Sequence, residues 1–118
     1  MDWTVKVVDE FAPEFGRLAP EAQDEIAAVV RLLRKFGPAL RRPHCDTLNG
    51  SRYSNMKELR FVAAGGVWRV AFAFDPKRRA IFLVAGDKSG TSEARFYRVL
   101  IRTADERFAR HLKTMKEK

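Results

Sequence analysis

The chain has 118 residues, of which 46% are hydrophobic and 11% aromatic, which indicates a globular protein and argues against a disordered one. Its formal net charge is +8, and residues 41–118 hold eighteen Lys/Arg against eight Asp/Glu. This imbalance favours a polyanionic partner such as nucleic acid or the ribosome, although basic surfaces also serve solubility.

The length predicts one domain over residues 1–118. The single cysteine, Cys45, excludes an internal disulfide framework and fits a reducing compartment. The first residues lack a signal-peptide pattern, and apolar runs stay well below the roughly 20 residues needed to span a bilayer. We therefore expect a soluble cytoplasmic protein with no membrane contact.

The first half of the chain predicts a short strand and two helices. Residues 3–8 alternate apolar and polar side chains, and residues 10–18 favour a short helix. A clearer helix begins at Pro20, has acidic residues near its start and basic residues near its end, and stops at Gly37. Its expected buried face is Ala22, Ile26, Val29, Val30, Leu33 and Phe36.

Residues 39–55 are rich in turn formers and predict an irregular connection. This segment carries four side chains that could reach a ligand: Arg41, Arg42, His44 and Arg52. A solvated connector is the commoner role of such a segment, and ligand binding is the alternative.

Residues 56–74 predict a β-hairpin that turns at Gly65-Gly66, because a glycine pair suits a two-residue turn. That turn would place Val62 opposite Arg69 and Arg60 opposite Ala71. One face would be apolar, and the other would collect six residues: Glu58, Arg60, Val62, Arg69, Ala71 and Ala73. We expect this second face to be open and basic.

The last part of the chain predicts a strand over residues 80–85, apolar on both faces and therefore central, and a helix from Ser92 to about Met115. The apolar stripe expected on that helix is Tyr97, Ile101, Ala104, Phe108, Leu112 and Met115. The order β-α-α-β-β-β-α predicts an α+β fold: a small, mostly antiparallel sheet packed on helices, with a long C-terminal helix.

The candidate chemistry lies in cations rather than in familiar enzyme motifs. The sequence has no Walker loop, no GxGxxG and no nucleophile elbow, and its two histidines and one cysteine lack metal-ligand spacing. We therefore expect no metal and no cofactor. RNA cleavage without a metal requires stabilisation of charge on the phosphate, which the guanidiniums of Arg60 and Arg69 would supply. A solvated sheet face is the alternative role of this pair.

Proton carriers for such a reaction are less well defined. Glu58 shares the face of the two arginines and could act as a base or as their ion-pair partner. Tyr97 and His111 are further candidates, with core packing and a surface position as their respective alternatives. The sequence does not decide which residue is the acid and which the base.

Several segments together resemble the RelE/ParE toxin superfamily, on its HigB-like, phage-derived branch. They are Leu48-Asn49-Gly50, Lys57-Glu58-Leu59-Arg60, Trp68-Arg69-Val70-Ala71-Phe72 and residues 82–90. The resemblance implies a type II toxin that cuts mRNA on the ribosome without a metal. It also implies phosphate-stabilising roles for Arg60 and Arg69 and aligns Lys88 with a lysine of the family. We expect RNA contacts from Lys57, Lys88 and Arg52.

The same resemblance implies partners. These are a helix-turn-helix antitoxin, the ribosome with its mRNA, and operator DNA reached only through the antitoxin complex. Two alternatives remain at this stage: a ParE-like inhibitor of DNA gyrase, and a non-catalytic member that binds antitoxin or nucleic acid.

Overall fold

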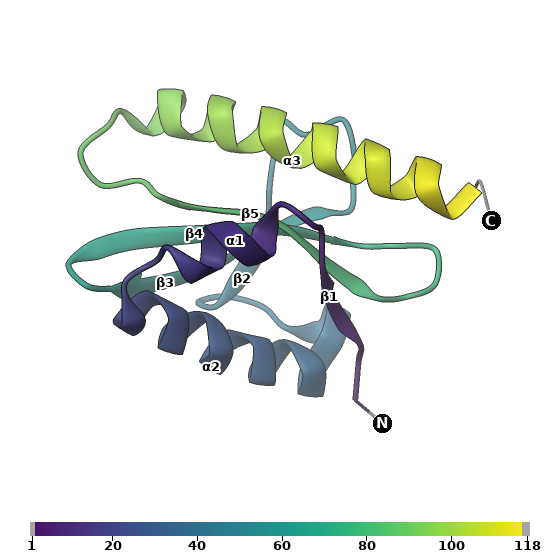
Figure 1. Cartoon of the computed structure of the whole chain (residues 1–118), viewed down its shortest axis with the longest axis horizontal. Coiled ribbons are helices and arrows are strands. Elements are labelled where there is room, and N and C mark those ends of the chain that lie inside the picture. Colours follow the sequence, from purple (N-terminus) through teal and green to yellow (C-terminus); the bar gives the residue numbers. More distant parts are fainter. Residues whose placement is uncertain (1, 117–118) are drawn as a thin grey trace.

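The computed structural model describes residues 2–116 and confirms the α+β fold (Figure 1). The elements are β1 (Val5–Val7), α1 (Phe11–Gly16), α2 (Pro20–Phe36), the 3₁₀ turn η1 (Gly37–Ala39), β2 (Cys45–Thr47), β3 (Met56–Ala63), β4 (Gly66–Phe74), β5 (Ala80–Asp87) and α3 (Glu93–Lys116). The predicted order holds, except that β2 lies within the segment expected to be irregular. Across residues 2–116, no helix combines the length and the apolar character that a membrane span needs.

The five strands form one sheet in the order β1-β5-β4-β3-β2. Only β1 and β5 pair in parallel, and the other neighbouring pairs are antiparallel. β5 lies between β1 and β4, as its two apolar faces predicted. The two edge strands have three residues each, which limits the open backbone that the sheet exposes.

The hairpin turns one residue earlier than predicted. Ala64 and Gly65 occupy the turn with φ of 51° and 76°, as a tight hairpin turn requires. Gly66 already belongs to β4, where an added Cβ would lie 2.5 Å from Asp87 Oδ2, so this glycine provides room rather than a turn. Arg60 therefore pairs directly with Arg69, and the predicted partners were wrong by two residues. A shift of two preserves the two faces of the hairpin.

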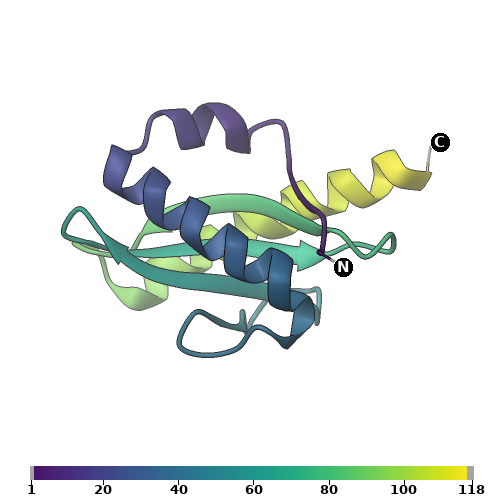
Figure 2. The same cartoon turned by 90° about the horizontal axis from the view of Figure 1, so that it is seen from below.

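Helices cover both faces of the sheet. α1 and α2 lie on one side and α3 on the other (Figure 1), and Figure 2 shows α2 crossing in front of the sheet with α3 behind it. The core under α1 and α2 contains Leu59, Val70 and Phe72 from the hairpin, as predicted. The predicted buried face of α2 holds except at Phe36, which is exposed.

The second face of the hairpin is not open, which corrects the sequence-based prediction. α3 packs on it through Leu100, Ala104 and Phe108, against the small side chains of Ala71 and Ala73. The small alanine side chains of this face leave room for α3 to pack closely on the sheet. The predicted stripe on α3 overlooked Leu100, which is buried.

Candidate functional site

A pocket of about 250 Å³ opens where β2, β3 and the first part of α3 meet. We call it the arginine pocket, and its lining is Arg42, Asp46, Thr47, Leu48, Asn49, Glu58, Arg60 and Tyr97. It is slightly smaller than typical small-molecule sites of roughly 300–1,000 Å³. Three of the predicted site residues, Glu58, Arg60 and Tyr97, therefore line the same cavity.

Glu58 and Arg69, which are buried, and Tyr97, which is partly buried, form a hydrogen-bonded cluster beside this pocket. The Tyr97 hydroxyl donates to Glu58 Oε1 at 2.8 Å and accepts from Arg69 Nε at 3.0 Å. Arg69 Nε also lies 3.2 Å from Glu58 Oε1, and its Nη1 donates to the Trp68 carbonyl at 2.9 Å. Arg69 is 4% exposed and Glu58 6%, so each charge is stabilised by the other.

The backbone explains why these three side chains meet. Glu58 and Arg69 lie on the same face of adjacent strands, two positions apart along the ladder. Tyr97 is in the first turns of α3, whose start is fixed by a hydrogen bond from the Arg95 N–H to Ser92 Oγ. The polar tip of Tyr97 thus reaches the sheet while α3 packs its apolar residues further along.

Tyr97 keeps its proton well above neutral pH. Burial raises its pKa, and its hydrogen bond to the Glu58 carboxylate raises it further, while the hydrogen bond from Arg69 acts in the opposite direction. The net change is upward. Tyr97 is therefore a neutral hydrogen-bond donor to Glu58 rather than a phenolate base.

Arg60 differs from Arg69 in its exposure and in its partner. Its side chain is 32% exposed, and Nη1 lies 3.9 Å from Asp46 Oδ2. Arg42 holds the same oxygen more closely, through Nε at 2.9 Å and Nη2 at 2.6 Å. The guanidinium of Arg60 thus faces the pocket and can reach a ligand there, whereas that of Arg69 is enclosed.

Lys88 lies near this cluster, in the connection between β5 and α3. Its Nζ donates to Glu93 Oε1 at 3.0 Å. The pKa of Glu93 is lowered first by Lys88 and more weakly by the charges of Arg69 and Arg60. The connection itself is held by Asp87 Oδ1, which accepts from the N–H groups of Val67 and Ser89.

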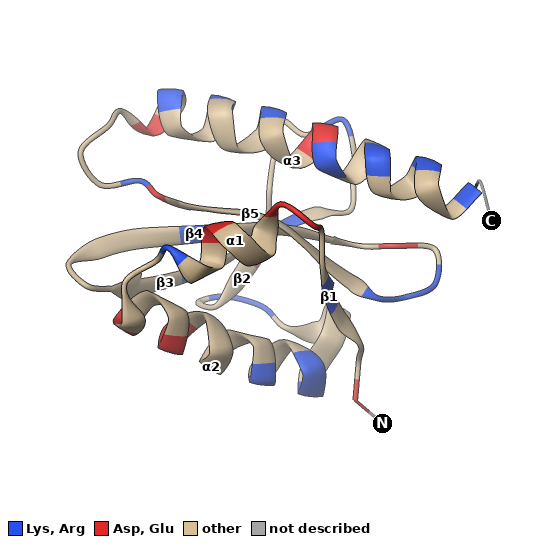
Figure 3. Cartoon of the chain, viewed as in Figure 1, with Lys and Arg blue, Asp and Glu red and all other residues tan. Residues whose placement is uncertain are grey.

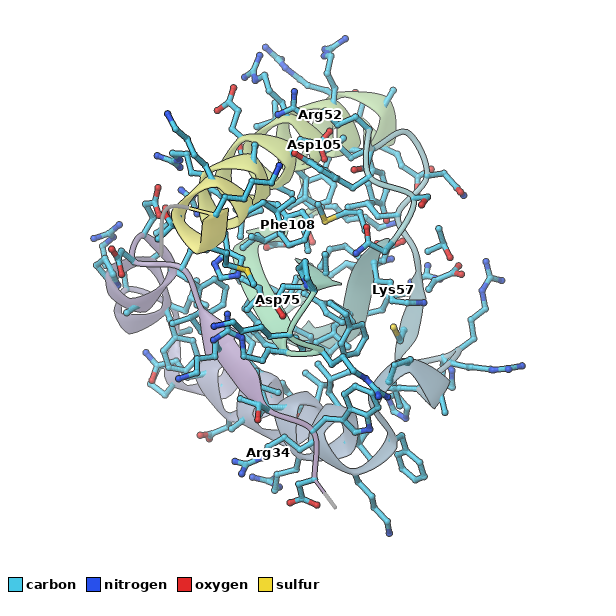
Figure 4. The ribbon with its side chains drawn as sticks, turned by 90° about the vertical axis from the view of Figure 1, so that its right-hand side faces the viewer. Arg34, Arg52, Lys57, Asp75, Asp105 and Phe108 are labelled. Atoms are coloured by element: carbon cyan, nitrogen blue, oxygen red, sulfur yellow. The ribbon has the colours of Figure 1, made fainter. Side chains whose placement is uncertain are left out.

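The other predicted site residues lie elsewhere. His111 follows Tyr97 by fourteen positions, about 21 Å along the helix, and its Nε2 is 2.9 Å from Asp75 Oδ2. Arg52 contacts Asp105 of α3, and Figure 4 shows these two together and Lys57 apart from them. Lys57 alternates with Glu58 along β3 and therefore points to the opposite sheet face.

Sequence reasoning named Arg42 and His44 only as side chains that could reach a ligand, with a solvated connector as the commoner role, and it gave no role to Asp46. A larger groove of about 650 Å³ between α2 and the hairpin brings Arg42 and His44 together with Arg60 and Arg69. The available signal was the run of basic residues in the connection before β2. Only the pairing of β2 with β3 makes that connection part of the site.

Among residues 2–116, no three His, Cys, Asp or Glu side chains are grouped so as to hold a metal ion. Cys45 is buried, and burial raises its pKa to about 11, so the thiol stays protonated. The charges available to a ligand are those of Lys and Arg, which Figure 3 shows in blue along α3 and in the loops.

Comparison with known proteins supports a single family. The model of the phage-derived Gp49-like proteins matches residues 13–109. The candidate toxin HigB2 of Mycobacterium tuberculosis is 42% identical over 111 residues, which are 93% of this chain and 54% of HigB2, so this chain spans about half the length of that relative. The candidate toxin HigB3 of the same organism is 44% identical over 93 residues, 79% of each chain.

A solved structure has the same fold. It is a two-arginine mutant of the Escherichia coli toxin RelE in the free state, with a TM-score of 0.61 and 10% identity over 86% of this chain and 96% of RelE. Both comparisons agree with the family resemblance found in the sequence. The chain therefore belongs to the Gp49-like family of phage-derived proteins, together with the HigB relatives, and has the fold of RelE.

Proposed function

We propose that this protein is the toxin of a type II toxin–antitoxin pair and that it inhibits translation by cutting mRNA on the ribosome without a metal. The observation that carries the proposal is the arginine pocket, where Arg60 faces a cavity shared with the carboxylate of Glu58 and the hydroxyl of Tyr97. Relatives named as candidate toxins support the same function.

In the proposed reaction, the 2′-oxygen of one nucleotide attacks the adjacent phosphorus. The O2′–P bond forms while the P–O5′ bond breaks, the 2′-hydroxyl proton goes to a base, and the departing O5′ takes a proton from water. The products are a 2′,3′-cyclic phosphate and a 5′-hydroxyl. Glu58 is the proposed base, because Oε1 is fixed by Tyr97 and Arg69 at the wall of the pocket. Arg60 is proposed to stabilise the added negative charge on the phosphate, in place of a metal ion.

The proposal assigns different tasks to the two arginines. Arg60 contacts the phosphate, whereas Arg69 fixes Glu58 and Tyr97, because its guanidinium is already shared among Glu58, Tyr97 and the Trp68 carbonyl. Lys88, which pairs with Glu93 in the free protein, is proposed to extend RNA binding beyond the pocket. Arg52 and Lys57 belong to more distant surfaces that would contact ribosomal RNA, and His111 takes no part.

The proposed partners are an antitoxin that blocks the site, and the ribosome that presents the mRNA. Operator DNA would be contacted only through the toxin–antitoxin complex. The basic residues of α3 and of the loops give the surface a charge suited to ribosomal RNA.

The decisive experiment maps mRNA 5′ ends after brief induction of the wild type and of Arg60→Ala. We expect new ends within translated codons for the wild type and their loss in Arg60→Ala. Arg31→Ala removes an exposed arginine from α2 and should cut like the wild type. Growth arrest with intact mRNA would overturn the proposal, and trapped gyrase complexes in those cells would identify a gyrase inhibitor instead.

A further inference from the structure

Asp46 stands between two arginines at the edge of the sheet. Arg42 binds Asp46 Oδ2 through two nitrogens at 2.9 and 2.6 Å, and Arg60 Nη1 approaches the same oxygen to 3.9 Å. Asp46 Oδ1 accepts the Thr47 N–H at 2.9 Å. Two guanidiniums from different parts of the chain thus converge on a single carboxylate oxygen.

The sheet register gives this carboxylate an unfavourable neighbour. Asp46 pairs directly with Glu58 across β2 and β3, so two acidic side chains share one face at adjacent positions. Like charges directly opposite each other destabilise a β-ladder. Because Arg42 and Arg60 face Asp46 and Glu58 in one pocket, that pocket has no net formal charge although the chain carries +8. Both arginines of the pocket are therefore already close to a carboxylate when a polyanion approaches.

The arginines nevertheless remain able to change partner. The Arg42 side chain is 74% exposed, and the 3.9 Å contact of Arg60 is longer than a hydrogen bond. Exposed ion pairs of this kind contribute little to stability. A phosphate accepts the same forked hydrogen bonds from arginine that a carboxylate does, so it can replace Asp46 as the acceptor.

We propose that Asp46 occupies the place of an RNA phosphate in the free protein, and that RNA binding moves Arg42 and Arg60 from Asp46 to a backbone phosphate. The inference rests on the proposed function, which supplies RNA as the polyanion. Arg42 is then a further RNA-binding residue, and Asp46 lowers the affinity of the pocket for RNA.

The test measures binding of a single-stranded 2′-O-methyl oligoribonucleotide, which lacks the hydroxyl that cleavage requires. Asp46→Asn removes the charge and keeps the shape, and it should bind about tenfold more tightly than the wild type at low salt, since a local opposing charge is lost. Asp9→Asn makes the same change in net charge at an exposed position beyond β1, the opposite edge of the sheet, and should gain less than about twofold.

Salt dependence and a double variant identify the partner of the phosphate. The slope of log affinity against log salt should steepen by about 0.7 for each phosphate that gains a contact in Asp46→Asn. Arg42→Ala should weaken binding more in the Asp46→Asn background than in the wild type. In the wild type the phosphate contact of Arg42 replaces an existing contact with the Asp46 carboxylate, whereas in Asp46→Asn it replaces none. Thermal melting of each variant checks that the fold is retained.

The outcomes separate this inference from the proposed function. Two results would contradict the proposed move of the arginines from Asp46 to a phosphate. One is equal oligonucleotide affinity in Asp46→Asn and Asp9→Asn. The other is a gain in affinity in Asp46→Asn that persists in full when Arg42 is also replaced. Absence of oligonucleotide binding by every variant at low salt would overturn RNA as the ligand. If Asp46→Asn binds the oligonucleotide more tightly but the wild type cuts no mRNA, the exchange of arginine partners is supported and the proposed nuclease activity is refuted.

Discussion

The two ends of α3 place similar chemical groups against the sheet. Near its start, Tyr97 bonds to Glu58, which is paired with Arg69. Near its end, His111 lies against Asp75, which is paired with Arg79. Each end thus combines a proton-carrying side chain, a buried carboxylate and an arginine.

The two carboxylates differ in what surrounds them. Asp75 Oδ1 accepts the N–H groups of Lys77 and Arg79 at 3.0 Å each, and Oδ2 accepts from the Arg79 side chain and contacts His111. Its acceptors are used to hold the β4–β5 turn. The side-chain contacts that the described residues make to Glu58 fall on Oε1, and Glu58 lines a pocket. A carboxylate such as Asp75, whose oxygens already accept hydrogen bonds from the backbone, is suited to a structural role. A carboxylate such as Glu58, which lines a pocket, is suited to catalysis.

The largest expected effect separates the two carboxylates by activity. Glu58→Gln should lower the rate of mRNA cleavage on purified ribosomes by about 100-fold or more, because the amide is not a base. Asp75→Asn is the matched change at the other end, and it should leave the rate per folded molecule within about twofold. A large loss of rate in Asp75→Asn with little loss in Glu58→Gln would contradict the assignment of Glu58 as the base.

The next effect concerns stability. Asp75→Asn should lower the free energy of unfolding by roughly 2–3 kcal/mol, since the buried donors around it lose a charged acceptor. Urea titration measures this difference. Asp46→Asn, at an exposed ion pair, should leave the urea midpoint within error of the wild type. Similar losses for both variants would contradict the structural role of Asp75.

A smaller effect tests the two proton-carrying side chains. Tyr97→Phe removes the hydroxyl that fixes Glu58, and it should slow cleavage roughly fivefold, as loss of a hydrogen bond of about 1 kcal/mol implies. His111→Gln should leave the rate unchanged. Single-turnover cleavage at several pH values measures the rates of both variants. A loss of rate only in His111→Gln would show that His111 acts in the reaction and Tyr97 does not.

The smallest expected effect is the change in the free energy of unfolding at acidic pH. Burial raises the pKa of Asp75, but hydrogen bonds from Arg79 and His111 outweigh it, and the net change is downward. The stabilisation is therefore complete above the unfolded-state pKa of about 3.9 and is lost as the pH falls through the lower folded-state value. The stability gap between wild type and Asp75→Asn should shrink as the pH falls below about 4. A gap that widens on acidification would contradict this direction.

The error in the hairpin shows where sequence reasoning stopped. Alternation of apolar and polar residues correctly assigned Glu58, Arg60 and Arg69 to one face. It could not choose between turns at Ala64-Gly65 and Gly65-Gly66, because a shift of two preserves both faces. Asp87 favours the first turn by packing where a side chain on residue 66 would lie.

The sequence by itself determined the order of the elements, the two faces of the hairpin and the family, since periodicity and short motifs are local properties. The tertiary structure alone decided that α3 covers the second face, that Arg69 is buried while Arg60 faces a pocket, and that His111 is separated from Tyr97. It also brought Arg42 and Asp46 beside Arg60. These relations depend on pairing and packing between segments distant in the chain, which a local pattern does not encode.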